Sequence, residues 1–188
     1  FEPGEDSAPN VPKAVVGDAA RFDWGSDARP RVPWGDTVVY ELHVGTFTPL
    51  GTWTTAAAQL PGLAELGITT IELMPVAEFA GTRNWGYDGV FPFAPSRNHG
   101  TPADMRRFVD RAHQLGLKVM IDQVLSHTSD QHAWFQRSRA SRRNPRADWY
   151  VWADPQPDGT PPNNWLSVFG GSAWTWNARR RQYYLHSF

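Results

Sequence analysis

An apolar run followed by polar side chains marks the middle of the chain, from Leu117 to His132. The three apolar residues at 119–121 are of the kind that a strand buried on both faces requires. Asp122 follows directly, and His127 comes five residues later. A carboxylate at the carboxyl end of a parallel strand, with an imidazole just beyond, is how an α/β barrel presents acid–base and hydrogen-bonding groups to a ligand. The same two side chains also fit a hydrogen-bonded pair with a purely structural role.

The composition of the 188 residues limits the classes of partner. A formal net charge of −1 gives no electrostatic reason to expect binding to nucleic acid or to an anionic membrane. No run in the sequence approaches the roughly 18 apolar residues of a membrane helix. The chain contains ten Trp, five Tyr and ten Phe. Because aromatic rings stack on sugar rings as well as fill cores, this content favours a carbohydrate partner.

The ends of the chain and its cysteine content bear on its length and compartment. The N-terminal sequence lacks the basic start and apolar run of a signal peptide, and it lacks Met. We therefore expect the chain to begin inside a longer reading frame. Since there is no cysteine, disulfides and thiol chemistry are excluded and a reducing compartment is permitted. We expect a cytoplasmic protein, formed by one compact domain or by a piece of a barrel that needs roughly 250 residues.

The elements that must position Asp122 and His127 alternate between strands and helices. Residues 1–36 are rich in Pro and Gly and predict an extended linker. The pattern then predicts a strand at 37–44, a helix capped by Thr54 or Thr55 and kinked or split at Pro61-Gly62, a buried strand at 68–74, and a long aromatic loop at 79–95.

The next helix carries the clearest local signals in the chain. Thr101 suits the N-cap, Pro102 the first helical position, and Gly116 a left-handed C-terminal cap. One apolar stripe is formed by Met105, Phe108, Val109, Ala112 and Leu115. The strand at 117–122 follows at once. Right-handed crossovers between the three predicted strands make their sheet parallel.

The chain changes character after His132. A short helix is expected at 133–143, with Trp134 and Phe135 on one side, and its arginines predict a solvated face rather than a nucleic-acid site. Two aromatic runs, Ser172–Trp176 and Gln182–Phe188, predict an antiparallel pair. Residues 128–188 therefore resemble a small β-rich domain inserted after the third strand, while residues 37–127 form the α/β part.

Several other chemistries lack their sequence patterns. The turn after the first strand has neither G-x-G-x-x-G nor G-K-[ST], which argues against a phosphate cradle and favours a barrel. His127 and His132 are five residues apart in an expected loop, and H-E-x-x-H is absent, so we expect no metal and no cofactor. A Ser-His-Asp arrangement stays open on composition, although the G-x-S-x-G elbow is absent.

Asp122 to His127, read as D-Q-V-L-S-H, resembles the first signature region of the α-amylase superfamily, glycoside hydrolase family 13, usually D-x-x-x-N-H. Ser126 replaces the usual Asn. Residues 100–188 are similar to α-glucosidases and oligo-1,6-glucosidases, through strings such as DWYVW and PPNNWLSVFGGSAWTW. Residues 1–98, with YELHVGTFT and ELMPVAEFAGTRNWGYDGVFPFAPS, are similar to maltooligosyltrehalose trehalohydrolases and isoamylase-type debranching enzymes. The two resemblances suggest a composite chain, and a single divergent lineage is the alternative.

The resemblance implies a fold and a set of roles. The fold would be the N-terminal part of a (β/α)₈ TIM barrel, about three strands and two helices, with the start of a β-rich inserted domain. Tyr87, with Trp85 as a weaker neighbour, would stack on the sugar in the −1 subsite. His127 would bind a hydroxyl of that sugar, and Asp122 would support the site.

The resemblance also implies what these residues lack. A retaining glycosidase needs two carboxylates about 5–5.5 Å apart, and in this family they come from later strands. We therefore expect no catalytic residue in this chain, which would be an inactive fragment of a retaining α-glucoside hydrolase or transglycosylase acting on α-glucans or malto-oligosaccharides. A non-catalytic carbohydrate-binding or scaffold protein of the same fold is the alternative.

Overall fold

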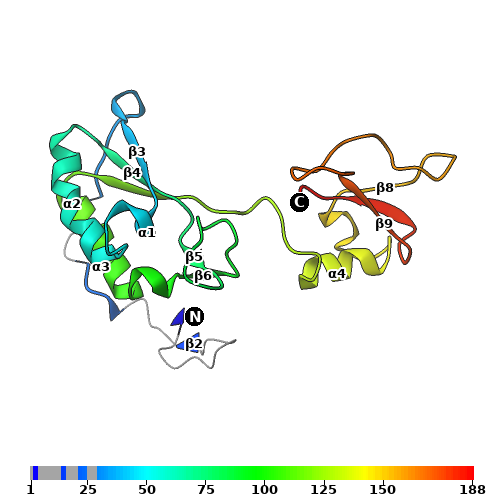
Figure 1. Ribbon diagram of the computed structural model, residues 1–188, viewed down its shortest axis with the longest axis horizontal. Helices are drawn as coiled ribbons and strands as arrows, with labels where there is room; N and C mark the ends of the chain where they lie inside the picture. Colours follow the sequence, from blue (N-terminus) through cyan, green and yellow to red (C-terminus); the bar gives the residue numbers. More distant parts are fainter. Residues whose placement is uncertain (1, 4–13, 16–20, 25–28) are drawn as a thin grey trace. The chain divides into compact units, whose positions relative to one another are not determined.

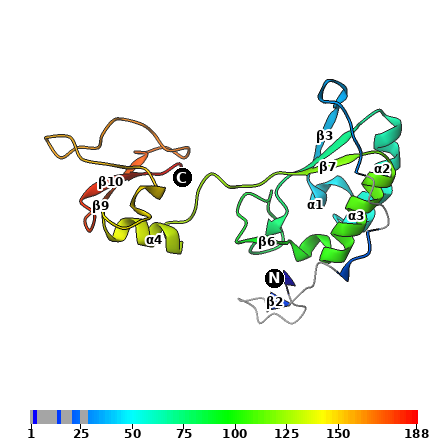
Figure 2. The ribbon, with the colours of Figure 1, turned by 180° about the vertical axis from the view of Figure 1, so that it is seen from behind.

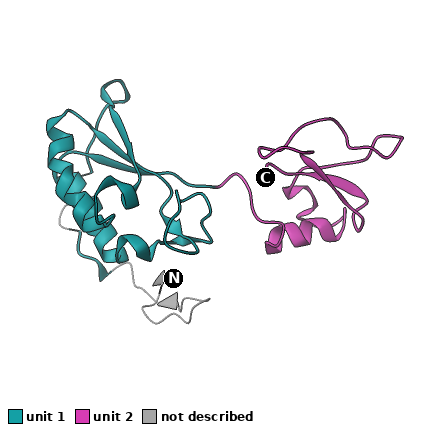
Figure 3. Cartoon of the chain, viewed as in Figure 1, with its two compact units in different colours: residues 1–124 teal, residues 125–188 magenta. Residues whose placement is uncertain are grey.

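The computed structural model describes residues 2–3, 14–15, 21–24 and 29–188. The chain divides into two compact units, residues 1–124 and 125–188, shown in teal and magenta in Figure 3. Most of the linker expected at residues 1–36 lies outside the described residues, apart from the short antiparallel pair β1 (Glu2–Pro3) and β2 (Ala14–Val15) and the 3₁₀ turn η2 (Trp34–Asp36).

Unit 1 is built on a three-stranded parallel sheet, as the alternating pattern predicts. Its strands are β3 (Val39–Leu42), β4 (Thr70–Leu73) and β7 (Lys118–Ile121), in the order β3-β4-β7. The register places Leu42 beside Leu73 and Leu73 beside Ile121. Leu42 and Leu73 are buried, which shows that this row of side chains faces the core.

The helices lie on one face of this sheet, side by side in both views of the ribbon (Figures 1 and 2). They are α2 (Trp53–Glu65) and α3 (Pro102–Gln114), with the single-turn α1 (Val44–Phe47) directly after β3. Trp53 and Phe108 are fully buried between them, with ring centroids 5.5 Å apart. The opposite face is open, since Val39 and Met120 are 41% and 43% exposed.

The start of α2 differs from the sequence-based prediction. Thr52 is the N-cap, not Thr54 or Thr55. The Thr52 hydroxyl accepts a hydrogen bond from the Thr55 backbone N–H, and the Thr55 hydroxyl accepts one from the Thr52 backbone N–H. The two bonds form a capping box. The helix also continues through Pro61 without splitting, because the buried Ala56 and Leu60 hold that segment on the core.

The predicted ends of α3 are confirmed. The Thr101 hydroxyl accepts from the Asp104 N–H, the Asp104 carboxylate accepts from the Thr101 N–H at 2.8 Å, and Pro102 occupies the first position. Gly116 has φ +78°, the left-handed conformation expected of a C-terminal cap. The aromatic loop contains a pair that the sequence did not reveal: β5 (Ala77–Glu78) and β6 (Phe91–Pro95) are antiparallel, followed by the turn η3 (Arg97–His99).

Unit 2 consists of one helix against a small antiparallel sheet. The elements are α4 (Ala133–Ala140), the turn η4 (Ala147–Trp149), and the strands β8 (Trp152–Ala153), β9 (Trp174–Asn177) and β10 (Gln182–Leu185), in the sheet order β8-β10-β9. The predicted antiparallel pair is confirmed as β9 and β10. Trp134 and Phe135 do not share an environment, because Phe135 is buried whereas Trp134 is 46% exposed.

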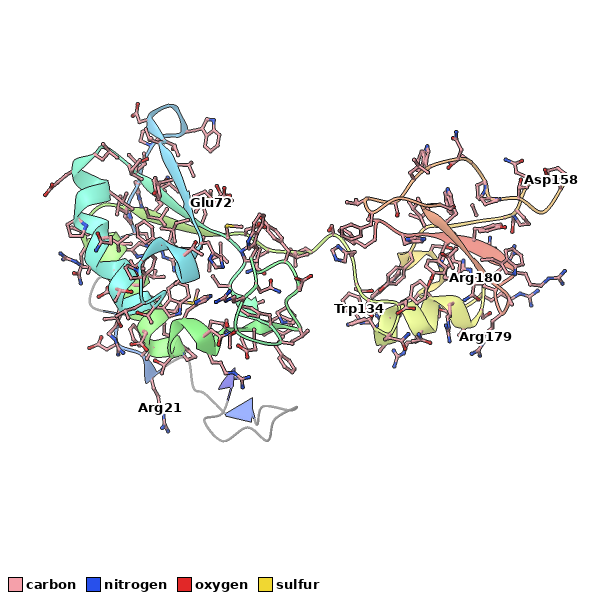
Figure 4. All side chains as sticks on the ribbon, in the orientation of Figure 1. Arg21, Glu72, Trp134, Asp158, Arg179 and Arg180 are labelled. Atoms are coloured by element: carbon pink, nitrogen blue, oxygen red, sulfur yellow. The ribbon has the colours of Figure 1, made fainter. Side chains whose placement is uncertain are left out.

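Arg180 joins the helix of unit 2 to the sheet. Its guanidinium donates to the carbonyl oxygens of Ser138 and Ala147, at 2.8 and 2.7 Å, and to the Gln182 side chain at 2.7 Å. The same group lies 4.4 Å from the ring centroid of Trp152. Figure 4 labels Arg180 in the interior of the unit and the neighbouring Arg179 on its rim. Arg180 therefore binds carbonyl groups near the end of the short helix and at the start of the turn.

Candidate functional site

The carboxyl end of the parallel sheet presents a row of acidic side chains. In the sheet register Glu41 lies beside Glu72, and Glu72 beside Met120. Because side chains alternate along a strand, Asp122 projects from the same face as Met120. Its backbone N–H still donates to the Leu73 carbonyl at 2.9 Å, so Asp122 sits at the point where the strand leaves the sheet. Sequence reasoning found Asp122 but missed Glu41 and Glu72.

The loop after β4 is shaped by Asn84. Its side-chain oxygen accepts from the Gly86 N–H at 2.7 Å, and its amide nitrogen donates to the Asp88 carboxylate at 2.8 Å. Gly86 has φ +102°, and a Cβ at this position would lie 1.9 Å from the Pro75 carbonyl oxygen. The loop therefore turns tightly against the end of β4. It exposes Trp85 and Tyr87, which are 74% and 47% accessible.

His43 ties this loop to the end of β3. Its Nε2 atom lies 2.9 Å from the backbone oxygen of Asn84, and its Nδ1 atom lies 3.3 Å from the Thr46 hydroxyl. Since a carbonyl only accepts, Nε2 carries the proton of the neutral ring. The contact joins residues 41 apart in sequence. It thereby fixes the backbone immediately before Trp85.

A second histidine, His99, packs against His43. His99 is 5% exposed, and its ring lies perpendicular to that of His43, with centroids 5.8 Å apart. Its Nδ1 donates to the Gly51 carbonyl at 3.2 Å. Burial lowers the pKa of His99 below its ordinary value of 6.5. Gly45 lies against both rings, because a Cβ there would come within 2.9 Å of His43 and 3.0 Å of His99.

Tyr87 and Asp122 are brought together in unit 1. Hydrogen bonding of the Tyr87 phenol with the Asp122 carboxylate is the main reason why the pKa of Tyr87 is raised above its ordinary value of 10.0. Desolvation and the negative charges of Asp122, Glu41 and Glu72 raise that pKa further. An aromatic face therefore stands beside a group of carboxylates at the sheet end, an arrangement able to stack on a sugar ring and to accept from its hydroxyls.

His127 belongs to unit 2 and is exposed. Its Nδ1 atom lies 3.0 Å from the Ser126 hydroxyl, and its ring lies 4.9 Å from that of Phe188. The Ser126 contact shows that the residue in the position of the usual Asn is itself a hydrogen-bonding partner of the histidine. The other ring nitrogen is available to a ligand hydroxyl.

Three acidic residues of unit 2 have local partners. Asp154 pairs with Arg142 at 2.8 Å, and Asp148 lies 3.8 Å from Arg180. Asp158 accepts from the Thr160 hydroxyl, which lowers the pKa of Asp158 below its ordinary value. Among the described residues, no group of three or more His, Asp or Glu side chains could hold a metal ion. Within the same residues no helix is long and apolar enough to cross a membrane.

Comparison with known proteins gives consistent matches. The chain is 48% identical over 160 residues to a probable alpha-glucosidase of Rhizobium meliloti, covering 82% of this chain and 29% of that protein. It is 49% identical over 115 residues to a malto-oligosyltrehalose trehalohydrolase of Deinococcus radiodurans, covering 61% of this chain and 19% of that one. A crystal structure of an alpha-glucosyl transfer enzyme superimposes with a TM-score of 0.64 at 48% identity, over 84% of this chain and 30% of that one.

These matches bear on both resemblances seen in the sequence. The chain spans less than a third of the length of each of these relatives. The alpha-glucosidase match is longer than the part of the chain after residue 98, so similarity to that lineage extends into the first half as well. The family model described as "Alpha amylase, catalytic domain" matches residues 19–188. The chain belongs to the α-amylase catalytic-domain family, whose relatives named here include enzymes of α-glucoside chemistry.

Proposed function

We propose that this chain carries part of the −1 sugar subsite of a retaining α-glucoside hydrolase or transglycosylase acting on α-glucans or malto-oligosaccharides. In this assignment Tyr87 stacks on the sugar, with Trp85 beside it, and His127 binds a sugar hydroxyl. Asp122 supports the site by accepting from Tyr87. The position of Tyr87 carries the proposal. Its ring is exposed in the loop that follows β4, and Asp122, the main influence on its pKa, lies at the carboxyl end of the parallel sheet.

The parallel order β3-β4-β7, with helices on one face, supports a place in the N-terminal part of a (β/α)₈ barrel. In such a barrel the face that carries Glu41, Glu72 and Met120 would point inward. The catalytic carboxylates would then be supplied by strands that follow these 188 residues. An oxocarbenium-like transition state gains from a flat aromatic platform and from hydroxyl contacts that tighten as the ring distorts.

A second candidate function is a carbohydrate-binding protein without catalysis. The observation that favours it is the position of the acids in unit 2, since Asp148, Asp154 and Asp158 make structural contacts. The two candidates share the same sugar site. They differ only in whether a nucleophile and a general acid join that site.

Titration of the 188-residue chain with maltose tests the sugar site. We expect Tyr87→Ala to weaken binding at least tenfold and Tyr87→Phe to weaken it less, because Phe keeps the ring and loses the hydroxyl. Trp34→Ala is the matched control, since Trp34 is 87% exposed and precedes the amino end of β3, whereas the loop follows the carboxyl end of β4. Equal affinity in all four proteins would refute the assignment. Hydrolysis of p-nitrophenyl α-glucoside by this chain would refute the claim that the catalytic carboxylates lie elsewhere.

A further inference from the structure

Exposed tryptophans in unit 2 differ in what covers their ring faces. Trp134 and Trp149 meet edge to face at 5.0 Å, and the Arg146 guanidinium lies 5.6 and 4.0 Å from their centroids. Trp165 is 58% exposed, and its ring contact is a near-parallel stack on Trp174, at 6.4 Å and 25°. At this separation the two rings are offset, so Trp174 covers only part of one face of the Trp165 indole. The rest of the Trp165 ring is open to water.

The Trp165 ring is held in place by its neighbours. The Asn163 side-chain oxygen accepts from the Trp165 backbone N–H at 3.0 Å and from the Trp174 indole N–H at 2.8 Å. The Ala173 N–H donates to the Trp165 carbonyl at 2.8 Å, and Trp174 beneath is 7% exposed. Since the platform is already ordered, stacking a ligand on it costs little conformational entropy.

Asn163 also supplies a polar group beside the platform. Because both of its contacts come from N–H donors, the accepting atom is the amide oxygen, and the orientation of the amide follows. The NH₂ group is then directed away from these two contacts. Asn163 is exposed, so this NH₂ can donate to a hydroxyl of a bound molecule.

Trp165 lies in the same unit as His127, and aromatic contacts lead from His127 to Phe169, close to Trp165 in sequence. The His127 ring lies 4.9 Å from Phe188, and Phe188 lies 5.8 Å from Phe169. Phe169 is 82% exposed and follows Trp165 by four residues, within a turn closed by the Ser167 N–H and the Gly171 carbonyl at 3.1 Å. Aromatic contacts thus extend from His127 to Phe169, which lies four residues after Trp165 in the same segment.

We propose that Trp165 and Asn163 form an additional glucosyl-binding subsite on unit 2. A glucose unit of an α-linked oligosaccharide stacks on the open face of Trp165 and accepts a hydrogen bond from the Asn163 amide. The choice of an α-glucan ligand rests on the function proposed above. The subsite gives longer oligosaccharides a second point of attachment and so favours them over maltose.

The test follows the ten indole N–H signals of the ¹⁵N-labelled chain by NMR during titration with maltohexaose, with cellohexaose as the β-linked control. Trp165→Phe identifies the Trp165 signal. We expect that signal to shift with maltohexaose, and Trp165→Ala to weaken binding about tenfold. Asn163→Asp keeps an acceptor for both N–H groups and loses the donor, so we expect a smaller loss. Trp149→Ala, at a site covered by Arg146, should bind as the unaltered chain does.

The outcomes separate this inference from the proposed function. Unchanged affinity in Trp165→Ala, with binding lost in Tyr87→Ala, would overturn the subsite and leave the proposed function standing. A shift of the Trp165 signal that persists in Tyr87→Ala would support the subsite alone. An equal response to cellohexaose would overturn its α-glucan specificity. In each variant the other indole signals report whether unit 2 remains folded, so that loss of binding through unfolding is recognised.

Discussion

Replacement of Gly86 by Ala tests whether the loop geometry sets the environment of Tyr87. At φ +102° an L-residue is strained by about 1–3 kcal/mol. The added Cβ would also lie 1.9 Å from the Pro75 carbonyl oxygen, so the two atoms must separate by about 1 Å to reach a tolerable contact. The rigid end of β4 holds Pro75, and we therefore expect the loop to move and the Tyr87–Asp122 hydrogen bond to be lost.

Two other glycines separate the contributions of backbone and steric strain. Gly67 has φ +93° with no atom within 4 Å of an added Cβ, so Gly67→Ala measures the cost of positive φ alone. Gly62 lies inside α2 with equally open surroundings, so Gly62→Ala should stabilise the chain by about 0.5–1 kcal/mol. Chemical denaturation of the three variants gives these values. Gly86→Ala should cost more than Gly67→Ala, because the contact with Pro75 adds to the strain of positive φ.

The decisive measurement is the titration of Tyr87. With ¹³Cζ-labelled tyrosine, each of the five Tyr gives an NMR signal, and Tyr87→Phe assigns the one of interest. In the unaltered chain its pKa should lie above 10.0. In Gly86→Ala it should fall toward 10.0, while Gly67→Ala and Gly62→Ala leave it unchanged. A raised pKa that survives in Gly86→Ala would refute the link between the loop and the hydrogen bond.

Three further predictions concern stability. Arg180→Met removes the buried hydrogen bonds to two carbonyl groups and should destabilise unit 2 by about 3 kcal/mol. The tryptophan signals of unit 2 should then report unfolding at a lower denaturant concentration. An unchanged midpoint would contradict the role of this side chain. The pKa of Asp104 is lowered chiefly by its hydrogen bond with the Thr101 hydroxyl. The ionised carboxylate therefore stabilises the folded chain above pH 3.8, and this stabilisation is lost as the pH falls through the lowered pKa. Asp104→Asn should remove this dependence when unfolding is measured against pH. Burial lowers the pKa of His99, so the unfolded chain binds the proton more tightly and the free energy of unfolding should fall as the pH drops below 6.5. His99→Gln should flatten this part of the curve of stability against pH. An unaltered curve would exclude His99 as its source.

The sequence predicted best where the signals are local. The ends of α3 follow from Thr101, Pro102 and Gly116, each of which acts within one turn of the helix. The N-cap of α2 was misplaced because Thr52, Thr54 and Thr55 are all suitable, and only the backbone conformation selects Thr52. The pair β5–β6 was missed because β5 is two residues long and β6 contains prolines.

The candidate site shows why a sequence motif alone does not determine which residues contact one another. The spacing of Asp122 and His127 identified both residues, but Tyr87, which interacts with Asp122, comes from a distant segment. Asn84 meets His43 across 41 residues, and no periodicity in the sequence indicates that contact. Glu41 and Glu72 could have been suspected, since each precedes the last residue of its strand, yet only the register shows that they are neighbours.

Different long-range contacts set the position of the site residues and the orientation of the Tyr87 ring. Position is set by the sheet, because the register of β3, β4 and β7 brings Glu41, Glu72 and the strand end at Asp122 to one edge. Orientation is set by His43 and Asn84, which fix the loop so that the Tyr87 ring stays exposed while its hydroxyl is bound to Asp122. A ring held by its hydroxyl in this way keeps its apolar face free. That is the surface that stacking on a sugar requires.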